Sequence, residues 1–224
     1  MIDFNELIEN HVKRELKPKD IGRYYPSEIG SCIRKTWYSY KFPVETTTEK
    51  LKIFEMGNLL HHFIAQVLSS EKNTHIQLLE TELPFKMQFK DINVSGRIDN
   101  LLIVKETSRK ILVEIKSTKS INSLIEAQPH HLMQLQLYMH YLNVPDGALV
   151  YIEKNTLRAK TFEVKHDETI VAEALFRFQR LHEMLKTDVI PEAEARMNTD
   201  MSWMCKHCEY REKCFKDTPH LNGS

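Results

Sequence analysis

The segment Gly96–Ser120, GRIDNLLIVKETSRKILVEIKSTKS, decides the fold that we predict for this chain. Its two runs of branched apolar residues are separated by a polar turn at 106–109, which is typical of two antiparallel strands. Within the second run, side chains alternate between the two faces of the strand. One face receives Ile111, Val113 and Ile115, and the other receives Leu112, Glu114 and Lys116. Antiparallel pairing is expected to bring Asp99 beside Glu114 and Lys116.

Two carboxylates that converge on one point repel each other unless a cation lies between them. Hard divalent cations such as Mg²⁺ and Mn²⁺ prefer oxygen ligands, so Asp99 and Glu114 are candidate ligands. The ammonium of Lys116 can orient a water or stabilise charge on a phosphoryl oxygen. An edge strand with a solvated Glu114–Lys116 pair, which guards against aggregation, fits the same spacing. Spacing alone leaves both interpretations open.

Composition and charge limit the class of protein. The chain has 224 residues, 42% of them hydrophobic, and no linker or low-complexity run divides it, so we predict a single domain over residues 1–220. Lys+Arg and Asp+Glu balance at 31 each, which excludes a global basic field and requires any polyanion site to be local. No signal peptide and no run of 18 apolar residues occurs, so a soluble, cytoplasmic protein is expected. We interpret the final residues, LNGS, as a tail and leave them out of the fold prediction.

The order of predicted elements favours an α/β fold, a mixed sheet flanked by helices. Apolar spacing predicts a helix in the first 16 residues, and Ser27 is a candidate N-cap for a short helix carrying Cys32. Four strand-like runs are expected between His75 and Lys116, and two more at 148–154 and 159–165. Further helices are predicted at Lys50–Ser70, Ala127–Leu142 and Glu168–Lys186, and the cysteine-rich end is expected to be irregular.

The helix at Lys50–Ser70 carries a candidate metal ligand. Gly57 and His61 are four residues apart and share one helical face. Glycine permits close approach of another backbone, and imidazole is a good ligand for Mn²⁺. An ordinary, partly buried histidine is the alternative for His61, whereas His62 is expected at the surface.

The helix at Ala127–Leu142 carries a polar and aromatic seam formed by His131, Gln134, Tyr138 and Tyr141. Spacings of three, four and three residues place these side chains along one side of the helix. Such a seam suits contact with phosphates or orientation of a catalytic lysine. Capping of the hydrophobic core by amphipathic side chains is the alternative.

The four cysteines indicate a metal site. Cys205, Cys208 and Cys214 form C-x₂-C-x₅-C, and Cys32 lies far upstream. In a reducing compartment such a group is typical of metal ligands, and the spacing leaves zinc and an iron–sulfur cluster both open. Binding of Cys32 together with the other three would join the two ends of the chain.

The ordered motifs GNLLH, GRID, EIK and QLQLY, bracketed by the cysteines, resemble the RecB-type nucleases of the PD-(D/E)XK superfamily that carry a 4Fe-4S cluster. Among these, the chain is similar to the CRISPR-associated exonuclease family. The resemblance covers about 32–214 and implies a restriction-endonuclease-like core at 50–186. A C-terminal cluster region at 200–216 is expected to close onto an N-terminal one at about 20–45. Ile98 stands where the superfamily name suggests proline, which the RecB branch often lacks.

The resemblance also implies the site residues. The expected Mn²⁺ or Mg²⁺ ligands are His61, Asp99, Glu114 and the backbone carbonyl of Ile115. The expected catalytic residues are Asp99, Glu114, Lys116, Gln134 and Tyr138. The expected cluster ligands are Cys32, Cys205, Cys208 and Cys214.

The activity implied by the resemblance is metal-dependent hydrolysis of single-stranded DNA from a 5′ end, in preparation for CRISPR spacer acquisition. The expected partners are DNA, the CRISPR integrase complex and further copies of the chain, and no membrane is expected. A competing hypothesis is a metal-stapled subunit that binds single-stranded DNA, or acts in repair, beside a partner nuclease or helicase.

Overall fold

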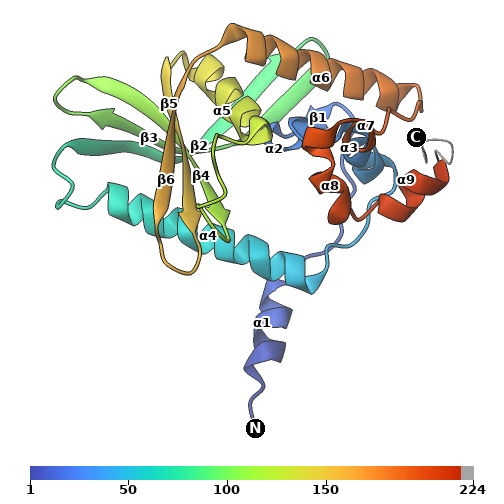
Figure 1. Cartoon of the computed structure of the whole chain (residues 1–224), viewed down its shortest axis with the longest axis horizontal. Coiled ribbons are helices and arrows are strands. Elements are labelled where there is room, and N and C mark those ends of the chain that lie inside the picture. Colours follow the sequence, from blue (N-terminus) through green and yellow to red (C-terminus); the bar gives the residue numbers. More distant parts are fainter. Residues whose placement is uncertain (218–224) are drawn as a thin grey trace.

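A computed structural model describes residues 1–217, and the LNGS segment lies outside the described residues. Its centre is a six-stranded mixed sheet, which confirms the predicted α/β class (Figure 1). Strand β3 pairs with β1, β2 and β4, and the sheet continues through β5 to β6. The β4–β5 and β1–β3 pairs are parallel and the others antiparallel. The strands are β1 (Arg23–Tyr24), β2 (Ile76–Phe89), β3 (Ile92–Val104), β4 (Arg109–Thr118), β5 (Asp146–Glu153) and β6 (Ala159–Lys165).

Helices cover both faces of this sheet. Helix α4 packs through Leu60 against Val113 and Ile115 on one face, while α5 and α6 contribute to the core on the other. The long helices are α4 (Thr48–Leu68), α5 (Pro129–Leu142) and α6 (Glu168–Lys186); the shorter ones are α1 (Phe4–Val12), α2 (Pro26–Ile29), α3 (Ile33–Lys41), α7 (Glu194–Met197), the 3₁₀ turn η1 (Thr199–Met201), α8 (Trp203–Lys206) and α9 (Arg211–Asp217). Within residues 1–217, no helix has the length and apolar character needed to span a membrane.

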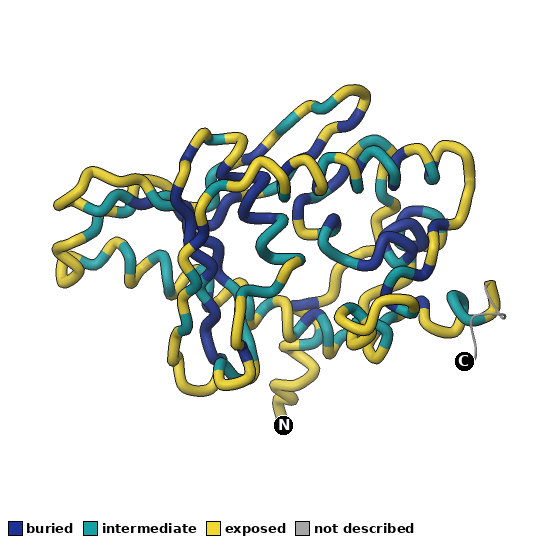
Figure 2. The backbone as a smooth tube through the Cα atoms, turned by 45° about the horizontal axis from the view of Figure 1, so that its top comes forward, coloured by how far each residue is buried: buried dark blue, intermediate teal, exposed yellow. Residues whose placement is uncertain are grey.

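Strand β4 is an inner strand, paired with β3 on one side and β5 on the other. Its residues Leu112 and Ile115 are completely buried, on opposite faces. In Figure 2, buried residues are concentrated in the central strands, and exposed residues run along α1. The edge-strand interpretation of Glu114 and Lys116 is therefore wrong, because a neighbouring strand occupies each edge of β4.

The N-terminal helical region differs from the prediction. Ser27 is not an N-cap but lies inside α2, because Pro26 starts that helix at its first turn and Glu28 accepts a hydrogen bond from the Tyr25 amide at 3.2 Å. The helix that follows Cys32 is a separate one, α3.

Two further predictions are corrected. The four runs expected between His75 and Lys116 are three strands, because the turn between β2 and β3 lies inside the second run, MQFKDINVSG: its first residues end β2, and its last residues begin β3, which continues through the third run. The C-terminal segment is not irregular but forms the short helices α7, α8 and α9. The two-residue strand β1 was not predicted.

Helices α2 and α3, near the N-terminal end, meet the C-terminal helices. Helices α2 and α3 lie beside α7, α8 and α9 in Figure 1. The amide of Ile33 donates to Glu194 at 2.9 Å, and Arg177 of α6 forms an ion pair with Glu194 at 3.0 Å. Gly30 lies so close to α5 that a Cβ there would be 2.3 Å from the His130 Cα. These contacts hold the region of Cys32 against both α5 and the C-terminal helices.

Candidate metal centre and cysteine pocket

Asp99 and Glu114 lie on the adjacent strands β3 and β4, and the charge of Asp99 acts on Glu114, although Glu114 is not in the group of ligand atoms formed by His61, Glu82 and Asp99. Their neighbours Asn100 and Val113 are register partners, as the predicted antiparallel pairing requires. Asp99 Oδ2 accepts a hydrogen bond from the Ile115 amide at 2.7 Å. Exposure is only 8% for Asp99 and 1% for Glu114, so both charges are withdrawn from solvent.

Lys116, Gln134 and Tyr138 surround one oxygen of Glu114. Glu114 Oε1 lies 2.7 Å from Lys116 Nζ and accepts a hydrogen bond from Gln134 Nε2 at 2.7 Å. Lys116 also donates to Gln134 Oε1 at 3.0 Å, and Gln134 Nε2 lies 3.2 Å from the Tyr138 hydroxyl. The structure thus brings together the predicted strand residues and the two predicted residues of α5.

The other oxygen of Glu114 has no such partners. Oε2 is buried and forms no hydrogen bond within residues 1–217. Burial and the charge of Asp99 raise the pKa of Glu114 to about 7, although Lys116 opposes the shift. Burial alone would lower the pKa of Lys116, but the attraction of Glu114 outweighs it and raises that pKa. A buried carboxylate oxygen without a donor, next to a second carboxylate, matches the chemistry of a hard cation.

Helix α4 supplies the nitrogen donor. His61 Nδ1 lies 3.3 Å from Asp99 Oδ1. Burial lowers the pKa of His61, but the hydrogen bond and charge of Asp99 outweigh burial and raise it. The expectation that Gly57 lets another backbone approach α4 closely is wrong. A Cβ at this position would meet Ser117 Oγ at 3.8 Å, which is an ordinary van der Waals contact. His62 is exposed, as predicted.

Glu82 is a residue of this site that the sequence analysis missed. Potential ligand atoms of His61, Glu82 and Asp99 lie within 4.8 Å of one another. Glu82 has a φ of +52° inside strand β2, a conformation rare for a residue with a side chain, and it pairs with Arg97 at 3.2 Å. Nothing in the run IQLLETELPF marks this backbone change. One nitrogen and several carboxylate oxygens form a donor set that suits Mn²⁺ or Mg²⁺.

Only part of the predicted seam on α5 reaches the site. His131 Nδ1 lies 3.0 Å from the Tyr151 hydroxyl, and burial lowers the pKa of His131 to about 2. Tyr141 is 42% exposed and packs on Phe85 at a ring distance of 4.9 Å. His131 and Tyr141 therefore cap the hydrophobic core, whereas Gln134 contacts Lys116 and Glu114, and Tyr138 contacts Gln134.

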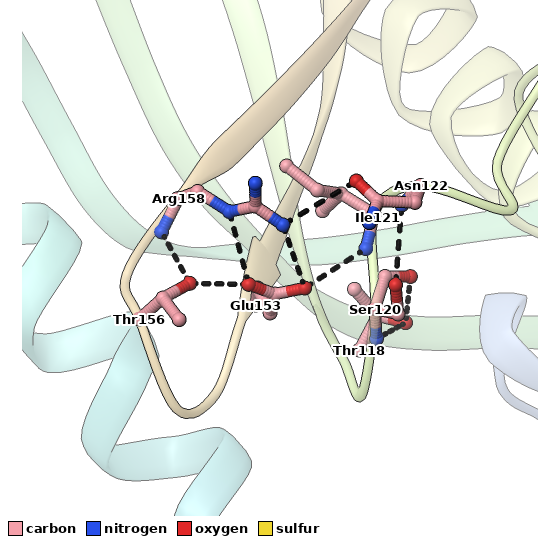
Figure 3. A network of polar contacts seen from close by, with 7 residues as sticks. All are labelled: Thr118, Ser120, Ile121, Asn122, Glu153, Thr156 and Arg158. Carbon is pink, nitrogen blue, oxygen red and sulfur yellow. Dashed lines mark hydrogen bonds and ion pairs between the residues drawn. The ribbon is translucent and has the colours of Figure 1, made fainter.

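A polar network fixes the segment that follows β4. Glu153 accepts hydrogen bonds from Arg158 at 3.1 and 3.2 Å, from the Ile121 amide at 3.4 Å and from Thr156 (Figure 3). These bonds, from Arg158 first and Thr156 next, lower the pKa of Glu153 to about 2. The network ties the β5–β6 hairpin to the connection between β4, which carries Lys116, and α5.

All four cysteines line a single pocket between the N-terminal and C-terminal helices. Burial raises the pKa of Cys205 and of Cys208, and the charge of Cys32 adds to both shifts. Arg34 lies beside them and donates from Nη1 to Cys214 Sγ at 3.8 Å. Four sulfur donors in one pocket fit either zinc or an iron–sulfur cluster.

The mixed sheet, with paired carboxylates and a lysine on its inner strands, defines a nuclease core of the restriction-endonuclease type. A model of the PD-(D/E)XK nuclease superfamily matches residues 27–215, so the chain belongs to that superfamily and is a nuclease.

Individual relatives agree with this assignment. The CRISPR-associated exonuclease Cas4 of Saccharolobus solfataricus is 24% identical over 212 residues, which cover 92% of this chain and 90% of the relative. The crystal structure of SSO0001 has a TM-score of 0.59 at 23% identity, covering 94% of this chain and 92% of that one. An alkaline exonuclease from Laribacter hongkongensis has a TM-score of 0.50 at 13% identity, covering 75% and 90%. The two solved structures share the fold.

Proposed function

We propose that this chain is a metal-dependent exonuclease that hydrolyses single-stranded DNA from the 5′ end and prepares DNA for CRISPR spacer acquisition. The observation that carries the proposed chemistry is the arrangement around Glu114. Lys116 and Gln134 hold one of its oxygens, and the other is buried without a donor among residues 1–217. The exonuclease and CRISPR elements of the proposal are supported by the name of the Saccharolobus relative. The CRISPR integrase complex is then the expected partner.

In this proposal His61, Asp99, Glu114 and the backbone carbonyl of Ile115 would hold Mn²⁺ or Mg²⁺. A cation held there would supply Lewis-acid chemistry, which polarises a scissile phosphate and makes a water more nucleophilic. The Ile115 amide orients Asp99 for this role, since it donates to the other oxygen, Oδ2, while Oδ1 faces His61.

Lys116 is placed to orient the attacking water and to stabilise negative charge on the phosphoryl oxygens. Its ammonium is fixed by Glu114 and Gln134, so little reorganisation is needed when charge develops. Tyr138 contacts the Gln134 amide, which in turn accepts a hydrogen bond from Lys116. Gln134 and Tyr138 therefore act as positioning residues in the proposed mechanism.

We assign the cysteine pocket to a structural 4Fe-4S cluster held by Cys32, Cys205, Cys208 and Cys214. Support comes from the convergence of a remote cysteine with the three C-terminal ones and from the buried Arg34 beside them, whose charge favours an anionic thiolate group. Anaerobic purification tests the assignment: a brown protein absorbing near ~400 nm supports the cluster. A colourless protein with stoichiometric zinc would reject it.

Cleavage assays test the nuclease proposal. Asp99→Ala, Glu114→Gln and Lys116→Ala are each expected to slow Mn²⁺-dependent cleavage of single-stranded DNA by about 10²–10³-fold, while EDTA abolishes it. Lys110→Ala, an exposed lysine of the same strand, is the matched control and is expected to cleave normally. Substrates labelled at the 5′ or the 3′ end, together with circular strands, report the polarity.

The same assays can overturn the proposal. Undiminished cleavage by all three active-site variants contradicts the assigned site. Degradation that starts from the 3′ end contradicts the proposed polarity. A wild-type protein that binds single-stranded DNA but leaves it intact with either metal favours the DNA-binding subunit instead.

A further inference from the structure

A second cluster of metal-ligating side chains lies at the other end of α5. His140 is in the last turn of α5, His166 follows β6, and Glu168 is the first residue of α6. One potential ligand atom from each of the three lies within 4.8 Å of the others. The helices that supply His140 and Glu168 lie side by side (Figure 1).

The distances between side-chain atoms in this cluster match the separation of two ligands bound to one metal ion, and they are longer than hydrogen bonds. Glu168 Oε1 lies 3.5 Å from His140 Nδ1 and 3.8 Å from His166 Nδ1. Both exceed a normal hydrogen bond, whereas His75 Nδ1 approaches Glu106 to 2.8 Å. Two ligands of a tetrahedral zinc, with bonds of about 2.0–2.1 Å, are about 3.4 Å apart. The two imidazole rings are stacked, with centroids 5.7 Å apart and an interplanar angle of 19°.

His166 is not explained as a hydrogen-bonded histidine of the core. Its Nε2 is buried and has no hydrogen-bond partner within residues 1–217. Its Nδ1 faces Glu168 beyond hydrogen-bond distance. Hydrogen bonding thus accounts for neither nitrogen.

The backbone that presents His166 is held in place by α5. Gln136, one turn before His140, is almost fully buried; its Nε2 donates to the Lys165 carbonyl at 2.7 Å and its Oε1 accepts from the Asp167 amide at 2.8 Å. The His166 amide itself donates to the Pro145 carbonyl at 3.0 Å. The residues on either side of His166 are therefore fixed to the helix that carries His140.

This cluster is separate from the candidate metal centre. Lys116 is the register partner of Tyr151, and Lys165, next to His166, is the partner of Asp146. Five residues of β5 separate these two levels, which is about 16 Å at the rise of a strand. The C-terminus of α5 and the negative charge of Glu168 favour a positive ion at this end, whereas the N-terminus of α6 opposes one, so the two helix ends offset each other and Glu168 supplies the net attraction.

We propose that His140, His166 and Glu168 bind a Zn²⁺ ion that joins the C-terminal turn of α5 to the start of α6. Two imidazoles and one carboxylate form a donor set that zinc accepts, and a water completes four-coordination. The hard ions Mg²⁺ and Ca²⁺ prefer sites with more oxygen donors, so the two metal sites differ in preference. The ion stabilises the packing of α5 on α6 and takes no part in DNA cleavage.

Zinc binding by the intact protein tests the proposal. Four proteins are purified with the cysteine site loaded: wild type, His140→Ala, His166→Ala and Glu168→Gln. Each is equilibrated with Zn²⁺ in the presence of excess Mn²⁺, and unbound metal is then removed. Bound zinc is then measured by elemental analysis. We expect each variant to retain one zinc per chain fewer than wild type, and His75→Ala, from the exposed His75–Glu106 pair, to retain as much as wild type.

Thermal unfolding supplies a second readout. Zinc at about a hundred times its dissociation constant is expected to raise the midpoint of wild type by about 5–10 °C and that of His140→Ala not at all. Equal zinc content in wild type and all three variants would overturn the proposal, as would an equal zinc-induced shift. If His166→Ala fails to fold, the more exposed positions of His140 and Glu168 keep the test decisive.

Discussion

At the scale of the residue, the two oxygens of Glu114 have different surroundings. Lys116 and Gln134 hold Oε1, whereas Oε2 is buried and has no donor in the described part of the chain. The contacts of Oε1 depend on Gln134, 20 residues away on α5, as much as on Lys116 of the strand itself. The chemical role proposed for Glu114 is therefore a property of its neighbours.

Glu82 provides a test at this scale. Its position within 4.8 Å of His61 and Asp99 leads us to expect that Glu82→Gln raises the Mn²⁺ concentration for half-maximal cleavage by about tenfold or more, because one negative charge is lost from the donor set. A metal titration of the cleavage rate measures this. Glu80→Gln, an exposed carboxylate two residues earlier in the same strand, is the control and should leave the titration unchanged. A normal titration for Glu82→Gln would exclude Glu82 from the metal centre.

At the scale of the element, α5 links the parts of the molecule. Its start meets α2 at Gly30, its middle supplies Gln134 and Tyr138, and its last turn carries His140. The contact at Gly30 is so close that the backbones nearly touch, and only a residue without Cβ fits there. Displacement of α2 would thus be transmitted to the helix that positions Lys116.

Two glycines with different surroundings test this contact. Gly30→Ala places a Cβ 2.3 Å from the His130 Cα and is expected to lower the free energy of unfolding by about 1–3 kcal/mol. Gly57→Ala in α4 meets only Ser117 Oγ at 3.8 Å, and is expected to raise that free energy by about 0.5–1 kcal/mol through helix propensity. Urea unfolding measures both. Equal effects of the two substitutions would argue against a close α2–α5 contact.

The Glu153 network predicts a pH dependence of stability. The pKa of Glu153 is lowered from 4.5 to about 2 in the folded chain, so the folded state binds this proton less readily than the unfolded state. The stabilisation by Glu153 is then fully present above about pH 4.5 and is lost as the pH falls toward 2.

Comparison with Glu153→Gln isolates this effect. The difference in unfolding free energy between wild type and Glu153→Gln is expected to shrink as the pH falls from 4.5 toward 2, and to be constant above that range. Urea unfolding of both proteins at matched pH values measures the difference. A difference independent of pH across this window would show that the hydrogen bonds of Figure 3 do not lower the pKa of Glu153.

At the scale of the whole molecule, the cysteine pocket brings Cys32, near the N-terminal end, together with the C-terminal helices. Cys32 lies just before α3, while Cys205 lies in α8, Cys208 between α8 and α9, and Cys214 in α9. The C-terminal helices are short and carry few buried residues of their own, since none is buried in α8 or α9. Their position therefore depends on the packing around the pocket and, in the proposed cluster, on bonds to the metal.

Loss of one cysteine should release this region first. Cys208→Ser is expected to lose the brown colour and to make the segment 200–217 susceptible to limited proteolysis, because few apolar contacts remain to hold it. Lys206→Ala, an exposed position between two of the cysteines, is expected to behave as wild type. Mass spectrometry of the fragments locates the cuts. Resistance of Cys208→Ser in this segment would show that packing alone holds the C-terminal helices.

The sequence by itself determined the element types and much of their order. Period-two alternation placed Glu114 and Lys116 on one face of a strand, and the helix at Glu168–Lys186 was predicted with the observed bounds. Such patterns are local, because the side-chain period of a strand or helix is set by backbone geometry. The motifs also picked out His61, Asp99 and Gln134, which the fold brings to one place.

Only the tertiary structure decided the contacts between distant segments. It showed that β4 is an inner strand, that Glu82 turns toward His61 through a positive φ, and that α2 ends against α5 at Gly30. It also showed that His140, His166 and Glu168 form a cluster separate from the candidate metal centre. None of these follows from a local period, because each depends on which surface a distant part of the chain covers.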